Sequence, residues 1–368
     1  MGNPLRLTVC GAGGAGLAIA ADNALKGIAV TLFELPLLEA NLVGPRARAG
    51  IEVTADSETT AGATGFARLA AVTSDAAAAV AGADVVMITV PAMYHDAFMD
   101  VLAPHLSAGQ IVLFNTGYWG SLRQTVRLAG RLPDVTLAES NIMPYICQPR
   151  GDAIHIGRYK RHFSVAAFPG ERSAAVYEVV HRIYEQYDPA GTVIDTNIAA
   201  AGNPPIHATL TIPIAGYYFD RYMGGKFYQD ATVPGARLVD AFDAERERLA
   251  THLGSELFEG EFDFDKRSYL YSGRDISEAL RSSPHADWHA TAAYLEQVCS
   301  EDIIYAFVPM VRLGQALGVD LPVTRAMVDI MGVMLQRDYW AEGIDLAALG
   351  LDGLELEGIK RFVIKGER

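Results

Sequence analysis

A glycine-rich run directly follows the short apolar segment Leu5–Cys10 near the start of the chain. The run consists of Gly11, Ala12, Gly13, Gly14, Ala15 and Gly16. Glycine at its first, third and sixth positions allows a tight turn, lets a pyrophosphate approach the backbone, and lets a helix pack closely on a strand. A helix that starts here would offer unpaired N–H groups to phosphates. The spacing predicts a dinucleotide site to which all six residues contribute. The alternative is a tight turn that binds no ligand.

A carboxylate ends the next apolar segment, Ala29–Glu34. Glu34 stands where an acid accepts hydrogen bonds from the ribose hydroxyls of adenosine. The next arginine along the chain is Arg46, so a 2′-phosphate would meet a negative charge without a nearby compensating cation. The sequence therefore predicts NAD as the cofactor, with NADH preferred over NADPH.

Two further apolar segments, Asp84–Pro91 and Gln110–Asn115, end in residues that could line the same site. In open α/β sheets, ligands bind outside the carboxyl ends of the strands. Val90, Pro91 and Asn115 are therefore candidate neighbours of the nicotinamide. For each of them, an ordinary exit from a strand is the alternative.

The segment Gly202–His207 carries the candidate catalytic residue of the second half. Its two consecutive prolines favour a chain break before a helix that begins near residue 205, and Pro213 should kink this helix. His207 lies in the first turn, and an imidazole titrates near neutral pH, as a general acid–base requires. The alternative for His207 is a buried core histidine. Asn203 is a candidate substrate-binding residue or a plain helix cap.

Asp329 is an acid within the otherwise apolar helical stretch Val323–Leu335. A buried carboxylate needs a partner, which makes Asp329 a candidate to orient His207. Arg325 lies four residues earlier on the same helical face, where it could pair with Asp329 or bind a substrate carboxylate. The acidic runs Glu259–Asp265 and Asp243–Glu247 are expected to be solvated surface.

The pattern of apolar runs predicts the scaffold that positions these residues. Expected strands are Leu5–Cys10, Ala29–Glu34, Asp84–Pro91, Gln110–Asn115, Val135–Ala138, Phe163–Phe168 and Thr192–Asp195. Expected helices between them are Gly16–Lys26, Asp75–Ala81, His95–Leu106, Ser121–Arg131 and Ala174–Tyr187. Near-continuous apolar strands separated by helices indicate a parallel sheet that is covered on both faces. The alanine-rich stretch Ala61–Ala83 is expected to be helix or loop.

From about residue 196 the pattern changes to long helices. Apolar residues recur at i, i+3 and i+4 in Leu238–Leu253, His289–Cys299 and Tyr305–Leu317. The sequence thus predicts an α/β protein: a doubly wound parallel sheet of Rossmann type in residues 1–195, then an all-α domain in residues 196–368. We expect the two domains to meet in a cleft, with Gly13 on one wall and His207 on the other.

Composition argues against several other classes of protein. The chain has 368 residues, of which 50% are hydrophobic and 20% charged, as in ordinary globular domains. Its formal net charge of −14, without long basic runs, argues against nucleic acid or a membrane as a partner. The isolated cysteines Cys10, Cys147 and Cys299 predict buried thiols, with no disulfide framework and no metal site. No signal peptide or membrane-length apolar run is visible, so a cytoplasmic location is expected.

In combination, these motifs resemble the opine dehydrogenase family, of octopine and nopaline type, and are similar to those of the bacterial N-(carboxyethyl) amino acid dehydrogenases. The resemblance rests on the order of the glycine run with its acid, Val90-Pro91-Ala92, Asn115-Thr116-Gly117, Asn203 with His207, and Asp329. It spans nearly the whole chain. It implies an oxidoreductase that joins an amino acid to a 2-keto acid and reduces the resulting imine with a hydride from NAD(P)H.

The resemblance also implies roles for single residues. The family's catalytic histidine maps onto His207, its partner aspartate onto Asp329, and an asparagine onto Asn203. The sequence departs from the family at Ala208, where relatives often have proline, and at the paired prolines before His207. These departures leave the amine and the keto acid open.

Other classes of protein share this two-domain plan. Keto acid reductases of the ketopantoate reductase and glycerol-3-phosphate dehydrogenase type use a catalytic lysine at the start of the helical domain, but Asn197–Asp220 contains none. An NAD-binding sensor without catalysis is a further alternative. The expected partners are small molecules, namely an amino acid and a 2-keto acid, and a homodimer is left open.

Overall fold

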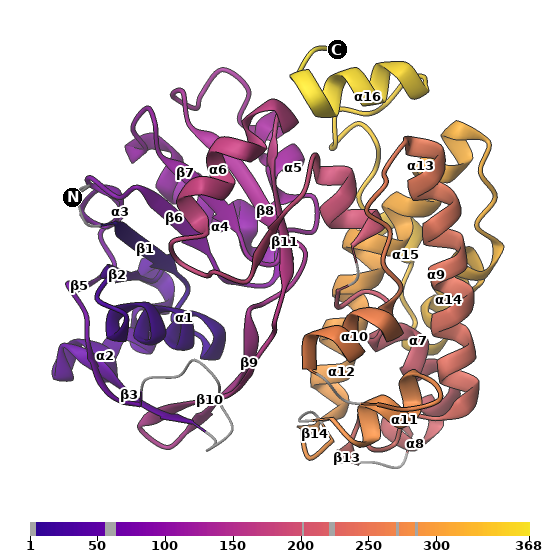
Figure 1. The fold of residues 1–368 in the computed structure, drawn as a ribbon, viewed down its shortest axis with the longest axis horizontal. Helices are drawn as coiled ribbons and strands as arrows, with labels where there is room; N and C mark the ends of the chain where they lie inside the picture. The colour runs from indigo at the N-terminus through magenta and orange to yellow at the C-terminus, as the bar shows by residue number, and fades with distance from the viewer. Residues whose placement is uncertain (1–4, 56–63, 201, 221–224, 270–271, 284–285) are drawn as a thin grey trace. The chain divides into compact units, whose positions relative to one another are not determined.

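The structure is a computed structural model that describes residues 5–55, 64–200, 202–220, 225–269, 272–283 and 286–368. It divides into two compact units, residues 1–191 and residues 192–368 (Figure 1). The first unit contains two larger β-sheets, and the second consists mainly of helices.

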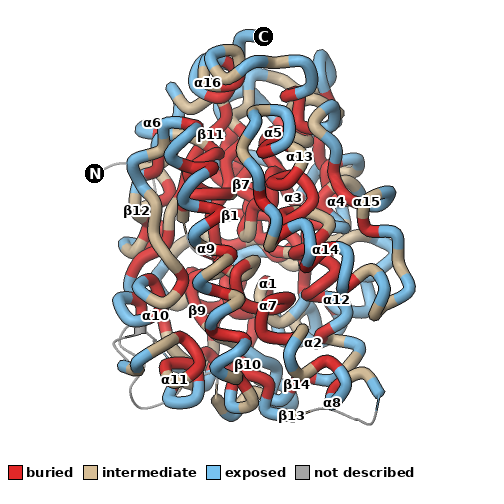
Figure 2. The backbone as a smooth tube through the Cα atoms, turned by 90° about the vertical axis from the view of Figure 1, so that its right-hand side faces the viewer, coloured by how far each residue is buried: buried red, intermediate tan, exposed pale blue. Residues whose placement is uncertain are grey.

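An 8-stranded sheet forms the centre of the first unit, in the order β12-β11-β8-β7-β6-β1-β2-β5. Its strands are β1 Arg6–Cys10, β2 Ala29–Phe33, β5 Ala71–Thr73, β6 Val85–Ile88, β7 Ile111–Phe114, β8 Thr136–Ser140, β11 Phe163–Phe168 and β12 Tyr187–Pro189. Neighbouring strands run parallel except for β11 against β8. Strands β6 and β7 are buried along their whole length, and Figure 2 shows the buried backbone at β1 and β7. The expected Rossmann-type sheet is confirmed.

The helices of this unit follow the expected order, except that α2 was not predicted. They are α1 Gly14–Leu25, α2 Val43–Arg48, α3 Ala76–Val80, α4 His95–Leu102, α5 Gly120–Arg127 and α6 Ser173–Val180, with 3₁₀ turns at Pro36–Leu42, Ala92–Tyr94, Ala103–His105 and Gly170–Arg172. Helices α3 and α4 share an apolar core with β6 and β7, through side chains that include Phe98, Met99, Val86 and Phe114. Burial on both faces explains why these strands are almost uniformly apolar.

A second sheet of 4 strands, β4-β3-β10-β9, contacts α1 and was not predicted. It consists of β3 Gly50–Ala55, β4 Gly65–Arg68, β9 Tyr145–Arg150 and β10 Ala153–Tyr159. The expectation of helix or loop for Ala61–Ala83 was therefore wrong in part. Strands β4 and β5 lie within this range, while residues 61–63 are outside the described part. Short strands with small or mixed side chains lack the continuous apolar run that identified the central strands.

The end of the first unit also differs from the prediction. Helix α6 ends at Val180, and β12 takes the place of the strand that was expected at Thr192–Asp195. There the Asp195 carboxylate accepts hydrogen bonds from the N–H and the hydroxyl of Thr192, and a π-helical turn, Asp195–Ala199, follows. A side chain that bonds the backbone three residues away favours a turn over a strand.

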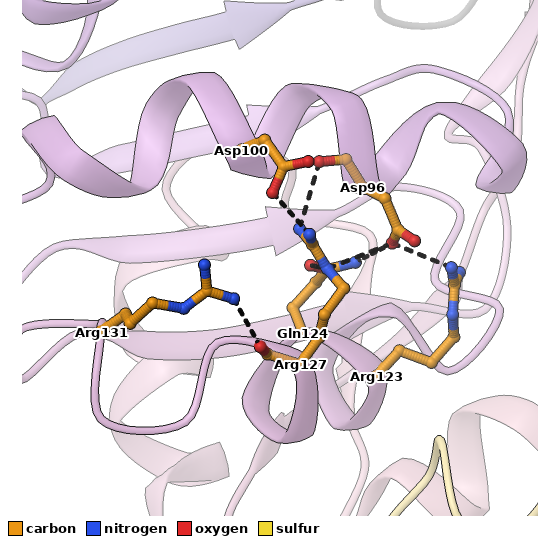
Figure 3. Close-up of polar contacts among 6 residues, drawn as sticks. All are labelled: Asp96, Asp100, Arg123, Gln124, Arg127 and Arg131. Carbon is orange, nitrogen blue, oxygen red and sulfur yellow. Dashed lines mark hydrogen bonds and ion pairs between the residues drawn. The ribbon is translucent and has the colours of Figure 1, made fainter.

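Helices α4 and α5 are joined by a network of charged and amide groups (Figure 3). The Asp96 carboxylate accepts hydrogen bonds from Arg123, at 2.9 Å, and from Gln124, at 2.5 Å. Arg127 donates to Asp100 at 2.5 Å and to the Asp96 carbonyl at 3.1 Å. The network links the helices that follow β6 and β7.

The second unit is helical, as predicted. Its helices are α7 His207–Thr211, α8 Ala215–Phe219, α9 Val233–Leu253, α10 Glu261–Tyr269, α11 Ile276–Arg281, α12 Ala292–Asp302, α13 Val308–Leu317, α14 Pro322–Leu335, α15 Tyr339–Glu342 and α16 Leu356–Lys365. Two-residue strands, β13 Gly225–Lys226 and β14 His289–Ala290, form the only ladder among its described residues. The predicted kink at Pro213 is confirmed, because the 3₁₀ turn Ile212–Ile214 separates α7 from α8.

The expectation that the two acidic runs lie at the surface was wrong in part, since Glu247 and Asp263 are exposed but three other acids are not. Glu245, Glu261 and Asp265 are buried, with 2%, 2% and 5% of their surface exposed. Glu245 accepts hydrogen bonds from the backbone N–H groups of Val323 and Thr324, each at 2.8 Å. It thus places a negative charge at the N-terminus of α14, where a helix favours one. A helix end that is distant in sequence supplies this partner, so the local charge pattern does not reveal it.

The expectation that all three cysteines are buried is confirmed for two of them. Cys10 and Cys299 are buried and Cys147 is half-buried, and none of the three forms a disulfide. Burial raises the pKa of the Cys147 thiol to about 12, and it also raises the pKa values of Cys10 and Cys299. In the described part of the chain, no helix is long and apolar enough to cross a membrane.

His95, the first residue of α4, should make the fold sensitive to acid. Its imidazole is fully buried with its ring centre 4.9 Å from that of Phe114, and burial, together with the charge of Arg123, lowers its pKa from 6.5 to about 3. Between these values the unfolded state binds a proton that the folded state does not. The free energy of unfolding should therefore fall by about 1.4 kcal/mol per pH unit as pH decreases from 6.5 toward 3.

Urea titrations across this pH range would measure the slope for the wild type, His95→Gln and the control His105→Gln, which removes an exposed histidine. His95→Gln should flatten the slope, and the control should retain it. Identical slopes for wild type and His95→Gln would contradict the assignment.

Candidate active site

The glycine run forms the turn between β1 and α1, and its geometry requires glycine at two positions. Gly11 has a φ of +105°, and a Cβ there would lie 2.4 Å from Val90 Cγ1. A Cβ on Gly16 would lie 1.7 Å from the Gly11 carbonyl oxygen. A Cβ on Gly13 would meet no atom within 4 Å, so one side of the loop is open. The loop therefore packs tightly at Gly11 and Gly16 but leaves space beside Gly13.

Helix α1 begins at Gly14, and no side chain among the described residues caps its N-terminus at Gly13. The first-turn N–H groups of a helix have no intrahelical acceptor, so they can bind an anionic group. Gly14 also lies close to β9, where a Cβ would be 3.3 Å from Pro149 Cδ. Ala12 and Ala15 complete the turn between these glycines. The open side at Gly13 and the uncapped helix fit a dinucleotide pyrophosphate.

Glu34 follows β2 and is 2% exposed. Its carboxylate accepts hydrogen bonds from the backbone N–H of Ala12 and of Leu35, both at 2.9 Å, and from the Asn41 amide at 3.2 Å. The carboxylate therefore holds the glycine loop and the end of β2 together. Arg46 is paired with Glu39 at 2.5 Å.

Three predicted cofactor residues follow strands β6 and β7. In the sheet, β6 lies between β7 and β1. Val90 and Pro91 are half-buried after β6, and Val90 borders Gly11 as described above. Asn115 is 1% exposed; its side-chain oxygen accepts a hydrogen bond from Ser140, and its amide nitrogen lies 3.4 Å from Met143 Sδ. All three are at the carboxyl edge of the sheet, where the glycine loop also lies.

His207 is the first residue of α7 and is 6% exposed. Its Nδ1 lies 2.9 Å from Oδ2 of Asp302, the last residue of α12, which has no exposed surface. Helices α7 and α12 pack against each other, and Figure 2 shows α7 as buried backbone. The expectation of a buried core histidine and that of an acid-paired histidine are therefore both met by the same side chain.

The predicted pair of His207 with Asp329 is wrong. Asp329 is exposed, and its Oδ1 accepts a hydrogen bond from the indole N–H of Trp340 at 2.6 Å. Arg325 is also exposed, and its nearest acidic partner is Asp320, at 4.0 Å, so the alternative pairing with Asp329 is wrong as well. The reason is the orientation of α14, whose buried face is formed by Thr324, Met327, Val328 and Met331. Asp329 and Arg325 lie outside this face.

Sequence reasoning missed Asp302. The residue follows Glu301 directly and precedes the apolar run Ile303–Phe307. An acid that adjoins such a run was the same signal that selected Asp329, and it could have marked Asp302 as a second candidate.

Asn203 takes part in the turn before α7 through its backbone. Its carbonyl oxygen accepts a hydrogen bond from the N–H of Ile206 at 3.0 Å, and its side chain is half-buried. The N-cap of α7 is Ile206, so the helix-cap alternative for the Asn203 side chain is wrong. Substrate binding by Asn203 and Arg325 stays a prediction.

The His207–Asp302 pair has the geometry of a general acid–base with its orienting acid. A carboxylate on Nδ1 selects one tautomer and stabilises the imidazolium, which leaves Nε2 to exchange protons with a substrate. Among the described residues, no cluster of metal-binding side chains occurs. The chemistry that this arrangement supports is proton transfer.

Comparison with known proteins finds relatives of the whole chain and of its helical domain. Residues 189–335 match the family model "NAD/NADP octopine/nopaline dehydrogenase, alpha-helical domain". An opine dehydrogenase from Arthrobacter sp. (strain 1C) is 28% identical over 365 residues, which cover 96% of this chain and 98% of the relative. Vitopine synthase from Allorhizobium ampelinum is 23% identical, over 76% of this chain and 78% of the relative.

Solved structures show the same fold. Octopine dehydrogenase in complex with NADH and agmatine matches with a TM-score of 0.78 and 16% identity, over 99% of this chain and 98% of that one. Yersinopine dehydrogenase with NADP⁺ matches with a TM-score of 0.67 and 15% identity, over 99% of both chains. A ketopantoate reductase from Ralstonia eutropha JMP134 matches less well, with a TM-score of 0.57 and 16% identity, over 90% of this chain and 98% of that one. In sequence and in fold, the chain is thus similar to the opine dehydrogenases of octopine and nopaline type.

Proposed function

We propose that the protein is an NAD-dependent opine dehydrogenase, which condenses the amine of an amino acid with a 2-keto acid and reduces the product. The observation that carries the proposal is the buried pair of His207 and Asp302, in a domain that the family model matches. The full-length match to the Arthrobacter opine dehydrogenase supports it. The keto acid reductases are disfavoured, because Asn197–Asp220 offers no lysine.

His207 would carry the proton transfers of the condensation. Addition of the amine to the keto acid gives a carbinolamine, whose hydroxyl must be protonated to leave as water. Nε2 of His207 can deliver that proton while Asp302, held 2.9 Å from Nδ1, stabilises the charged ring. The bound nicotinamide supplies the hydride that reduces the imine.

The first unit would hold the cofactor through its glycine loop and strand ends. The uncapped first turn of α1 and the open side at Gly13 would bind the pyrophosphate, and Glu34 would accept hydrogen bonds from the adenosine ribose. Val90, Pro91 and Asn115 would lie near the nicotinamide. We propose NADH over NADPH, because Glu34 would repel a 2′-phosphate and Arg46 is already paired with Glu39. A shared cleft for Gly13 and His207, a cytoplasmic location and a homodimer remain predictions.

A coupled screen tests this function. Amino acids are combined with pyruvate and its homologues, and oxidation of NADH or NADPH is followed by absorbance, with each keto acid also assayed without amine. Oxidation that requires both substrates, and is faster with NADH, is the expected result. Oxidation without amine would instead indicate a keto acid reductase. Binding of NADH without any turnover would indicate a sensor, and faster NADPH turnover would contradict the role of Glu34.

A further inference from the structure

A buried arginine of α9 holds the segment that leads to His207. Arg246 is 2% exposed, and its Nε donates to the carbonyl of Ile198 at 3.1 Å. Its Nη2 donates to the carbonyls of Ala199, at 3.2 Å, and Ala200, at 2.8 Å. The π-helical turn ends at Ala199, so these carbonyls require donors from outside their own element.

Two acids, Asp243 and Glu261, extend the contacts of Arg246 to Gly202. Asp243 pairs with Arg246 through one carboxylate oxygen, and its other oxygen accepts the N–H of Glu261 at 2.7 Å. The Glu261 carboxylate in turn accepts the N–H of Gly202 at 3.2 Å. The first residue of α10 is therefore tied both to α9 and to the residue that opens the Gly202–His207 segment.

The network buries the charged groups Arg246 and Glu261, which costs free energy. We take this cost as a sign that the position of the bound backbone is important for function. A buried guanidinium costs free energy unless an acid compensates it, and Asp243 supplies that acid. Burial raises the pKa of Glu261, and the nearby carboxylates of Asp265 and Asp243 raise it further, while Arg246 lowers it. Ile206 and Leu210, at the N-cap and within α7, already pack in an apolar core. Such packing holds a helix in place without the cost of burying charges.

We propose that Arg246, together with Asp243 and Glu261, is a positioning group that fixes the backbone of Ile198–Ala200 and of Gly202 and thereby sets His207 against Asp302. The kinetic part of this inference rests on the proposed function. Only four residues separate Gly202 from His207, so we expect a shift at Gly202 to move the imidazole. A displacement of about 1 Å in a catalytic group can cost about a hundredfold in rate.

The test compares Arg246→Met and the conservative Arg246→Lys with Arg237→Met, which removes an exposed arginine from the same helix. Glu261→Gln is added because it keeps an acceptor for Gly202 without the charge. Three quantities are measured: hydrogen–deuterium exchange of the peptide 198–207, the titration of the His207 imidazole by NMR, and kcat per NADH-binding site. Normalising kcat in this way removes the effect of misfolded protein.

Arg246→Met should speed exchange of the 198–207 amides, shift the His207 titration and lower kcat per site by about tenfold to a hundredfold. Its affinity for NADH should stay near the wild-type value, because the glycine loop lies in the other unit. Arg246→Lys should recover part of each property, and Arg237→Met should match the wild type. If Arg246→Met fails to fold, Arg246→Lys and Glu261→Gln carry the comparison.

Unchanged exchange and an unchanged His207 titration in the Arg246 variants would overturn the proposal. Faster exchange with wild-type kcat per site would overturn it too, since the network would then be only structural. If the wild type turns over no pair of substrates, the proposed function fails, and exchange and titration alone decide whether Arg246 positions His207.

Discussion

Replacing His207 by alanine should lower kcat about a hundred- to ten-thousandfold, the usual cost of losing a general acid–base. Affinity for NADH should change little, because the residues that would bind the cofactor are in the first unit. Asp302→Asn should have an effect of similar order, since an amide of the same shape cannot stabilise the imidazolium beside it. Steady-state kinetics with the substrate pair found in the screen, and NADH binding by fluorescence, measure both effects.

Asp329→Asn is the matched control for Asp302→Asn. It makes the same chemical change in the same domain at an exposed acid bonded to Trp340, so near-wild-type turnover is expected. Because His207 and Asp302 act as one unit, the double variant should be little worse than the worse single variant. Equal turnover in Asp302→Asn and Asp329→Asn would refute the assignment of Asp302.

Gly16→Ala should abolish measurable NADH binding and lower the stability of the fold. The new Cβ would lie 1.7 Å from the Gly11 carbonyl oxygen and 2.8 Å from Thr89 Oγ1, so α1 would have to move away from β1. Overpacking of this kind costs about 1–3 kcal/mol or more, and it displaces the helix end that would bind the pyrophosphate. Thermal melts and NADH titrations report the two effects.

Two other glycines separate stability from binding. A Cβ at Gly13 or at Gly44 meets no atom within 4 Å, so neither Gly13→Ala nor Gly44→Ala should lower Tm appreciably. Gly13→Ala should nevertheless weaken NADH binding, because its methyl group would occupy the side of the loop that the pyrophosphate needs, whereas Gly44→Ala should bind normally. Wild-type affinity in Gly13→Ala would argue against this site for the pyrophosphate.

Local patterns in the sequence were sufficient for most of the fold. Continuous apolar runs predicted β1, β6 and β7, since strands covered on both faces have no solvent-facing positions to mark with polar residues. The spacing of Gly11, Gly13 and Gly16 predicted the turn between β1 and α1, because it reflects contacts within a single strand–turn–helix unit. The 3.6-residue period predicted α9, α12 and α13 for the same reason: each signal lies within one element.

Tertiary structure alone decided which acids are buried and what they bind. Asp329 and Asp302 both adjoin apolar residues in sequence, and the helices that carry them both contact α7. Only Asp302 reaches His207, because Asp329 lies outside the buried face of its helix. The sequence predicted Glu245 and Glu261 to be surface residues. In the structure, Glu245 accepts a hydrogen bond from a backbone N–H of α14, and Glu261 accepts one from Gly202, before His207. A carboxylate is stable in a core only where donors surround it. Those donors come from elements up to 95 residues away, so no local pattern contains them.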